Sequence, residues 1–242
     1  MNFKEKIKKC IYKQKYSSET FVSYLRKGGA KVGEGTYFFS PRTTYIDPVK
    51  LFFISIGSNC KITDQVTILA HDYSRSVVRF TYGINIGGGC PTTIGNNVFI
   101  GMKSTILMGT NIGNNVIVGA NSVVSGNIPD NSVVAGNPAR VICTLDEYRK
   151  KREQRCLSEA VACVHRVLEN TGKLPTIEQM GDGFAWLYLE RSDKTVNQYP
   201  KFFNLLGDDR NSVIDDFMKS KPIFNSFNEF LDCAVKQKDG DI

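Results

Sequence analysis

A six-residue repeat in the middle of the chain restricts its fold more than any other feature of the sequence. Residues 94–111 align with residues 112–129 at an offset of eighteen positions, with seven identities. Within each stretch an aliphatic residue opens every unit of six, and a small or β-branched residue usually stands four places later. The aliphatic positions are Ile94, Ile100, Ile106, Ile112, Val118 and Val124. The same frame fits upstream at Ile56, Ile62 and Ile68.

A period of six fits neither an amphipathic helix nor an alternating strand. It fits a chain wound into a triangular prism, with one unit of six on each side and three units in each turn. The aliphatic side chains then point inward and stack on their counterparts one turn away. Gly residues and Asn-Asn pairs are expected at the corners, because a positive φ is cheap for Gly and tolerable for Asn. Such hexapeptide repeats predict a mainly β fold, the left-handed parallel β-helix.

Changes in charge, repeat pattern and hydrophobic spacing along the sequence predict three domains. Residues 1–29 form a basic N-terminal helical segment, and residues 30–142 form the β-helix. Residues 73–93 leave the repeat as an extruded loop, and so long a loop on a repeat scaffold is commonly a functional surface. From Leu145 onward apolar residues recur at helical spacing. Residues 143–242 are therefore predicted to be a small helical C-terminal domain.

The net charge of +7 is concentrated at the start of the chain, where residues 1–31 carry nine Lys or Arg against two acidic residues. A solvated helix face explains such a cluster, and so does peripheral contact with an anionic lipid or glycan; both readings stay open. No nucleic-acid motif accompanies the charge, so no nucleic-acid partner is expected.

The cysteines and the hydropathy of the sequence indicate the cellular compartment in which the protein is expected. Seven cysteines form no C-x-x-C pair, which predicts a reduced protein. The first residues lack the apolar segment of a signal peptide, and no apolar run reaches the length of a membrane span. We therefore expect a cytoplasmic protein.

Three strings carry a resemblance to a known family: IGNNVFIG at 94–101, VGANSVV at 118–124 and AGNPAR at 135–140. Together they resemble the hexapeptide acetyltransferases, in particular a branch that includes maltose and galactoside O-acetyltransferases, bacterial polysaccharide O-acetyltransferases and streptogramin-type antibiotic acetyltransferases. The resemblance covers about residues 30–142 and implies the fold and acetyl-coenzyme A as donor. Residues 94–139 contain two charged residues, and such flat, weakly charged walls predict a homotrimer.

A hydroxyl that attacks a thioester needs a base whose pKa lies near neutrality, which histidine provides. His71 ends the string ILAH at the corner where the chain leaves the repeat, and the family's catalytic histidine occupies such a position. The other histidine, His165, lies in the helical C-terminal stretch and is expected to be structural. Asp72 either orients the imidazole or caps backbone amides.

The resemblance also implies the donor site. Gly119 and Ala120 match residues that contact the pantetheine arm in a groove between subunits, and Ser125 matches a hydroxyl-bearing contact. Arg140 matches a basic residue near the nucleotide phosphates, and Asn137 and Pro138 belong to the same terminal motif. The sequence departs from its relatives at Gly126, where a Lys is frequent, and at Phe99, where sugar-specific relatives often carry Trp.

The acceptor is expected to be a carbohydrate held in part by the extruded loop. The candidate acceptor-binding residues are Asp72, Arg75, Arg79, Tyr82 and Phe99. The predicted function is O-acetylation of a sugar hydroxyl in a bacterial surface polysaccharide or its precursor, by direct transfer in a ternary complex at a trimer interface. N-acetylation of an amino sugar and O-acetylation of an antibiotic are alternatives within the enzyme class.

Two further classes compete with an acetyltransferase. A metalloenzyme on the same scaffold, like the γ-type carbonic anhydrases, needs three histidine ligands for zinc, and the β-helix region has one. No metal is therefore expected. A trimeric structural or binding module without catalysis is the second competitor, and His71 beside a long loop argues against it.

Overall fold

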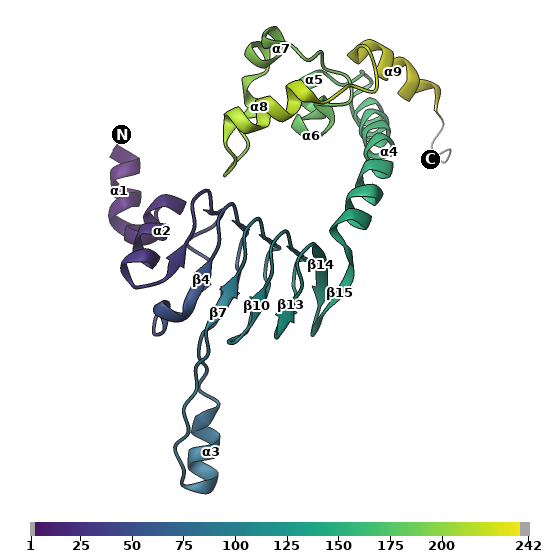
Figure 1. Cartoon of the computed structure of the whole chain (residues 1–242). Coiled ribbons are helices and arrows are strands. Elements are labelled where there is room, and N and C mark those ends of the chain that lie inside the picture. The colour runs from purple at the N-terminus through teal and green to yellow at the C-terminus, as the bar shows by residue number, and fades with distance from the viewer. Residues whose placement is uncertain (1–2, 238–242) are drawn as a thin grey trace. The chain divides into compact units, whose positions relative to one another are not determined.

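The computed structural model of the chain describes residues 3–237, which fall into two compact units, residues 3–148 and residues 149–237 (Figure 1). The first unit contains the repeat and the N-terminal helices. The second unit is helical. Each unit is described by itself.

The repeat forms a prism with three walls, each a sheet of short parallel strands. The first wall contains β1 (Lys31–Val32), β4 (Ile54–Ile56), β7 (Thr92–Ile94), β10 (Asn111–Ile112) and β13 (Asn127–Ile128). The second contains β2 (Tyr37–Phe38), β5 (Lys61–Ile62), β8 (Phe99–Ile100), β11 (Ile117–Val118), β14 (Ser132–Gly136) and the antiparallel β15 (Ala139–Thr144). The third contains β3 (Tyr45–Ile46), β6 (Thr67–Ile68), β9 (Thr105–Ile106) and β12 (Val123–Val124). The predicted left-handed β-helix is confirmed.

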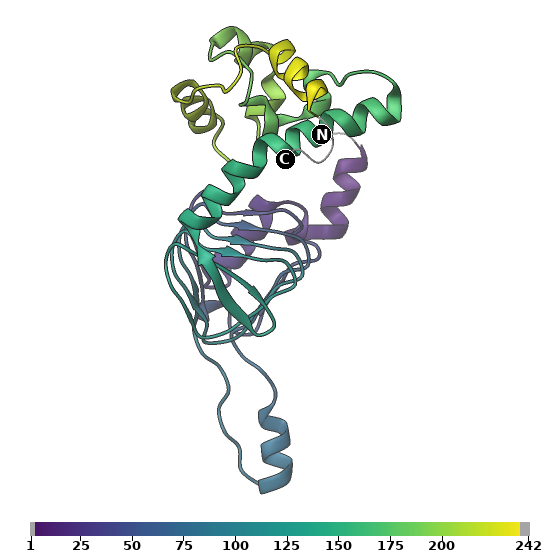
Figure 2. The same cartoon turned by 90° about the vertical axis from the view of Figure 1, so that its right-hand side faces the viewer.

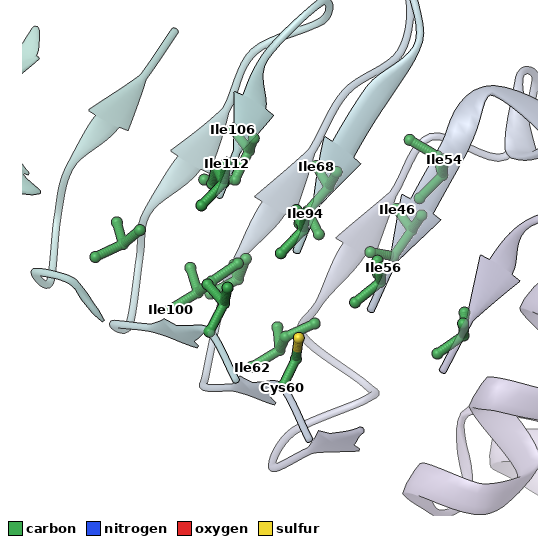
Figure 3. Packing of buried hydrophobic residues seen from close by; sticks show 14 of the residues in the cluster. Ile46, Ile54, Ile56, Cys60, Ile62, Ile68, Ile94, Ile100, Ile106 and Ile112 are labelled. Atoms are coloured by element: carbon green, nitrogen blue, oxygen red, sulfur yellow. The ribbon is translucent and has the colours of Figure 1, made fainter. Parts of the chain in front are cut away.

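The aliphatic positions of the repeat form the core of the prism (Figure 3). In the second wall, Ile62 is in register with Ile100, and Ile100 with Val118, so equivalent side chains lie one above another in successive turns. All three are fully buried. The positions four places later, such as Val98 and Ser104, are buried as well. The six-residue frame therefore identifies the inward-facing residues correctly.

The corners confirm the roles of asparagine and of glycine, since Gly109 and Gly126 have φ of 77° and 73°. Asn97, Asn115 and Asn131 have φ of 53°, 56° and 56°, and each is the asparagine that takes the left-handed conformation at its corner. Their amides form a ladder, in which Asn97 Nδ2 donates to Asn115 Oδ1 and Asn115 Nδ2 donates to Asn131 Oδ1, both at 2.9 Å. Gly95 serves close stacking instead, since a Cβ placed on it would lie 2.5 Å from the carbonyl oxygen of Gly113.

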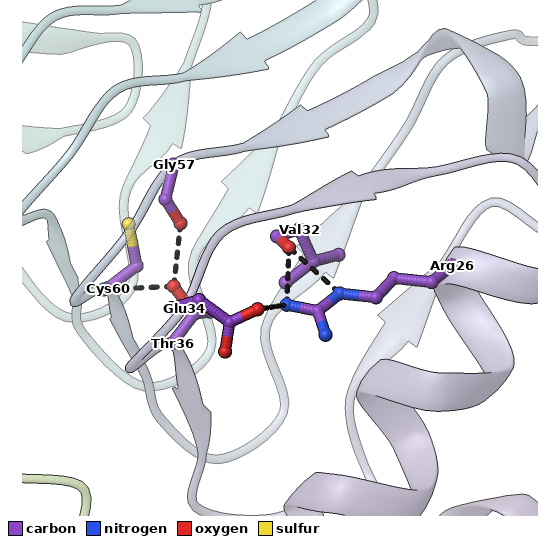
Figure 4. Close-up of polar contacts among 6 residues, drawn as sticks. All are labelled: Arg26, Val32, Glu34, Thr36, Gly57 and Cys60. Carbon is purple, nitrogen blue, oxygen red and sulfur yellow. Dashed lines mark hydrogen bonds and ion pairs between the residues drawn. The ribbon is translucent and has the colours of Figure 1, made fainter.

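The N-terminal segment contains α1 (Phe3–Tyr12), the 3-10 turn η1 (Lys13–Lys15) and α2 (Ser18–Lys27). Phe21 and Leu25 of α2 are buried in the same core as the prism, and the Phe21 ring lies 5.0 Å from that of Phe38. Arg26 of α2 donates through Nε and Nη2 to the Val32 carbonyl, at 2.9 and 2.7 Å, and forms an ion pair with Glu34 (Figure 4). Helix α2 therefore closes one end of the prism.

The predicted loop 73–93 is an arm that ends before Thr92, because Thr92 and Thr93 belong to β7. The arm projects from the prism and contains a helix, α3 (Arg75–Tyr82), which the repeat pattern did not indicate (Figures 1 and 2). At its base the Cys90 amide donates to the Ala70 carbonyl at 3.0 Å. Large apolar side chains of α3 face solvent, and Phe80 is 87% exposed. Nothing within the described part of the first unit covers this apolar face.

The second unit packs around aromatic side chains. Its helices are α4 (Leu145–Thr171), which begins in the first unit, α5 (Ile177–Met180), α6 (Asp182–Ala185), α7 (Asp193–Gln198), η3 (Pro200–Phe203), α8 (Arg210–Lys219) and α9 (Phe227–Lys236). Tyr188, Phe203, Phe217 and Phe230 are buried in its core. Within residues 3–237 no helix is both long enough and apolar enough to cross a membrane.

We expect Ile106→Ala to lower the free energy of unfolding by about 2–5 kcal/mol, because the substitution leaves a cavity between turns. Ile106 is 0% exposed. Ile142→Ala is the matched control, since it removes the same atoms from a side chain that is 62% exposed, and its expected effect is about 0.5 kcal/mol or less. Chemical denaturation at one protein concentration measures both, and equal losses would contradict the stacked core.

Candidate active site

His71 lies at the corner of the prism where the chain leaves the third wall for the arm. It follows β6 after Leu69 and the buried Ala70, and its side chain is 26% exposed. The imidazole Nδ1 contacts the Asp47 carboxylate oxygen Oδ2. No protein partner of Nε2 is found among residues 3–237, so this nitrogen is open to a ligand.

Asp47 occupies the equivalent corner one turn earlier. It follows β3, and β3 pairs with β6 so that Ile46 lies opposite Ile68. The Asp47 side chain is 0% exposed. Its Oδ2 accepts a hydrogen bond from the Ala70 amide at 3.1 Å, and its Oδ1 accepts one from the Val49 amide at 3.0 Å. The register of two neighbouring strands therefore places a buried carboxylate against His71.

Burial by itself raises the pKa of the Asp47 carboxyl, but hydrogen bonds from His71, Val49 and Ala70 outweigh it and hold this pKa below its ordinary value. Asp47 is therefore ionised at neutral pH and accepts a proton-bearing Nδ1. In the neutral imidazole this arrangement leaves Nε2 unprotonated, which is the form that takes up a proton. The buried carboxylate therefore fixes the orientation of the imidazole.

Asp72 has the second of its two predicted roles. Its Oδ1 accepts hydrogen bonds from the Ser74 amide at 3.0 Å and from the Ser74 hydroxyl at 2.7 Å, so it caps the start of the arm. The residue that contacts the imidazole is Asp47, which sequence reasoning missed. A carboxylate directly after the Tyr45-Ile46 strand, one turn before His71, was the signal that could have revealed it.

Two other residues border this corner. A Cβ placed on Gly89 would lie 3.6 Å from Phe53 Cε2 and 3.8 Å from His71 Cβ. Phe53 and His71 therefore lie close to the backbone of Gly89, in the segment of the arm that returns to the prism. Phe53 was also missed from sequence, because nothing in the repeat frame marks the segment that carries it.

The candidate donor residues gather mainly at the end of the prism opposite α2. A Cβ placed on Gly119 would lie 2.8 Å from that of Ala135, and Arg140 stands opposite Ala135 in the β14–β15 pair. Asn137 and Pro138 form the connection between these strands. Ala120 follows Gly119 and Ser125 follows β12, and both are exposed.

The candidate acceptor residues do not meet at His71 within one chain. Arg75, Arg79 and Tyr82 lie on α3, in the projecting part of the arm, and the Arg75 guanidinium stands 5.4 Å from the Tyr73 ring (Figure 1). Phe99 is exposed on the second wall, whereas His71 follows the third.

Cys60 and Cys90 are free thiols, the first buried in the repeat and the second exposed at the base of the arm. Cys60 is buried inside the prism, and burial raises the pKa of its thiol, so the nucleophilic thiolate is disfavoured. Among residues 3–237 no group of three or more His, Cys, Asp or Glu side chains is arranged to hold a metal ion.

Known proteins resemble the chain over its repeat. The family described as hexapeptide repeat of succinyl-transferase matches residues 91–126. Protein CapG of Staphylococcus aureus is 42% identical over 129 residues, 52% of this chain and 73% of CapG. The Escherichia coli (strain K12) protein named as lipopolysaccharide biosynthesis O-acetyl transferase WbbJ is 35% identical over 146 residues, 56% of this chain and 74% of that protein. Galactoside O-acetyltransferase of the same strain is 32% identical over 129 residues, 50% of this chain and 58% of that enzyme.

We expect Asp47→Asn to lower the free energy of unfolding at pH 7 by about 1.5–3 kcal/mol, the range for hydrogen bonds to a charged group. Because the pKa of Asp47 is lowered in the folded protein, its contribution is complete above the ordinary value of about 3.9 and is lost as the pH falls through the folded value. The difference between wild type and variant should therefore narrow below about pH 4.

Denaturation of wild type and variant at a series of pH values measures this difference. Asp215→Asn is the control, because it removes a carboxylate from an exposed side chain of α8 in the second unit. A difference between wild type and Asp47→Asn that stays constant down to pH values well below 4 would show that the Asp47 charge has no stabilising partner.

Proposed function

The chain belongs to the hexapeptide-repeat acetyltransferases, and we propose that it transfers an acetyl group from acetyl-coenzyme A to a hydroxyl of a bacterial surface polysaccharide or its precursor. The observation that carries the proposal is the buried Asp47 carboxylate against Nδ1 of His71, which leaves Nε2 available as a base. The names of two relatives, one for lipopolysaccharide biosynthesis and one for galactosides, favour a carbohydrate hydroxyl as acceptor.

The proposed reaction is one direct transfer in a ternary complex. Nε2 of His71 accepts the proton of the acceptor hydroxyl as its oxygen attacks the thioester carbonyl carbon. The Asp47 carboxylate stabilises the imidazolium that forms. The tetrahedral intermediate then breaks its carbon–sulfur bond, and the leaving thiolate of coenzyme A takes the proton from His71. The products are the acetyl ester and the free thiol of coenzyme A.

We expect His71→Ala to lower acetyl transfer by about two to four orders of magnitude, the usual span for a general base. The donor should still bind, because its proposed site lies elsewhere on the prism. His165→Ala is the matched control, since the only other histidine belongs to the second unit, where its Nε2 contacts the Ala234 carbonyl at 2.8 Å. Turnover of His71→Ala close to that of wild type would refute the mechanism.

We propose that the donor lies along the end of the prism that carries Gly119, Ala120, Ser125, Asn137, Pro138 and Arg140. The family resemblance assigns Gly119 to the pantetheine arm, and close packing admits no side chain there, because its Cβ would lie 2.8 Å from that of Ala135. Arg140 is exposed, and its one recorded hydrogen bond runs from Nη1 to the neighbouring Ala139 carbonyl at 2.9 Å. Its guanidinium has further donors for a phosphate.

We expect Arg140→Ala to weaken the binding of coenzyme A more than that of dephospho-coenzyme A, because a guanidinium forms charge-assisted hydrogen bonds with phosphate. Calorimetric titration with the two ligands measures the difference. Lys31→Ala is the control, because it removes an exposed positive charge from β1, the first strand of the first wall, whereas Arg140 lies on the last strand of the second wall. If Arg140→Ala weakens the binding of both ligands equally, Arg140 has a packing role and does not contact the phosphate.

We propose a homotrimer, with the donor grooves between neighbouring prisms. The walls support it, because residues 94–139 contain two charged residues, Lys103 and Asp130. The arm supports it too, because a second subunit can cover the exposed apolar face of α3. Light scattering at micromolar concentration should give three times the mass of the 27.0 kDa chain. The mass of a monomer would contradict a donor site shared between subunits.

We also propose that the protein is cytoplasmic and that α1 contacts the anionic inner face of the membrane. Helix α1 exposes Ile7 and Ile11 together with the exposed Lys8 and Lys9, a combination that suits a negatively charged lipid surface. Equal sedimentation of the protein with neutral and with anionic vesicles would refute this contact.

A further inference from the structure

The segment between β3 and β4 presents side chains that the proposed reaction does not use. It begins at Asp47 and includes the 3-10 turn η2 (Leu51–Phe53). Leu51 is buried against Gly28, where a Cβ would lie 2.2 Å from Leu51 Cδ1. The Phe53 amide donates to the Lys50 carbonyl at 2.8 Å. The segment is therefore held in place by its own hydrogen bonds and by the core.

Its outer surface combines aromatic rings with a cation. Phe52 is 60% exposed, and its ring meets that of the half-buried Phe53 edge to face, with centroids 4.8 Å apart. Lys50 Nζ lies 5.5 Å from the Phe52 ring centroid and 5.6 Å from that of Phe53. Within the described part of the chain, no carboxylate forms an ion pair with Lys50.

This surface adjoins the proposed base. Phe53 Cε2 and His71 Cβ both lie within 4 Å of the position that a Cβ on Gly89 would occupy. Asp47, which orients His71, starts the segment, and its Oδ1 is bonded to the Val49 amide. The rings and the ammonium group are therefore fixed relative to the imidazole by the same short stretch of backbone.

We propose that Lys50, Phe52 and Phe53 form the acceptor-binding surface and select a sugar that carries a negative charge, an inference that rests on the proposed function. The apolar C–H face of a sugar ring packs on an exposed aromatic ring, which removes apolar surface from water. A carboxylate or phosphate on the same sugar pairs with the ammonium group of Lys50. The hydroxyl to be acetylated then reaches Nε2 of His71.

Ligand-observed NMR tests the surface with three probes that differ at one carbon: p-nitrophenyl β-glucoside, p-nitrophenyl β-glucuronide and the 6-phosphate of the glucoside. Wild type should bind one or both charged probes more tightly than the neutral one, by up to about fivefold, which is the upper end of the range for an ion pair in contact with water. Comparison of the glucuronide with the 6-phosphate shows whether the surface prefers a carboxylate or a phosphate. Lys50→Gln should abolish the preference, and Phe52→Ala should weaken all three probes.

Lys31→Gln is the matched control for lost charge and should keep the preference, because Lys31 is an exposed side chain of β1. Equal binding of the three probes by wild type, or a preference that survives Lys50→Gln, would overturn the inference. A change of oligomeric state in Phe52→Ala would also overturn it, since the rings would then be a subunit contact. Acetyl transfer to the same probes, measured with wild type and with His71→Ala, tests the proposed function separately. If the charged probes bind more tightly but are not acetylated, the proposed function is refuted and the proposed acceptor-binding surface still stands.

Discussion

Each turn of the prism lies directly on the turn before it, and this close stacking determines where every other feature can be placed. Ile62, Ile100 and Val118 follow one another in a buried column, and the backbones of Gly95 and Gly113 approach too closely to admit a side chain. The interior has no room for a substrate. The chain can depart from the coil at its corners, where residues such as Asn97 take a positive φ. His71, the proposed base, and the start of the arm both lie at a corner.

The same stacking explains how a charged pair can be built at the edge of an apolar column. Because Ile46 is in register with Ile68, the residues that leave the two strands face each other, and Asp47 lies under Ala70 and His71. Burial opposes the carboxylate charge, and two backbone amides together with the imidazole counter that effect and keep the pKa low. A fixed charge in a water-poor corner then holds the imidazole in one orientation. Preorganisation of this kind costs no rearrangement during the reaction.

The sequence predicted those features that depend on the period of the repeat. The inward positions from Ile56 to Val124 and the corner that carries His71 follow from counting in sixes. Counting in sixes does not place Asp47, because Ile46 pairs with Ile68 at a separation of 22 residues and not of eighteen. It does not place Phe53 either, because the segment after Asp47 departs from the frame and packs through Leu51 and Phe52 against the Gly28–Gly29 turn. The helix in the arm was missed for a related reason: α3 has an apolar face with no partner in its own unit, so the fold of the unit gives no indication of it.

The central claim is that the His71–Asp47 corner directs an acetyl group to a sugar hydroxyl, and the chemical nature of the product tests this most directly. The full-length protein would be incubated with acetyl-coenzyme A and surface-polysaccharide fragments that contain both hydroxyl and amino groups. The fragments would then be analysed by mass spectrometry before and after mild alkali. We predict a gain of acetyl groups that alkali removes, because esters hydrolyse under these conditions and amides persist. Fragments that gain no acetyl group, or an acetyl group that resists alkali, would contradict it.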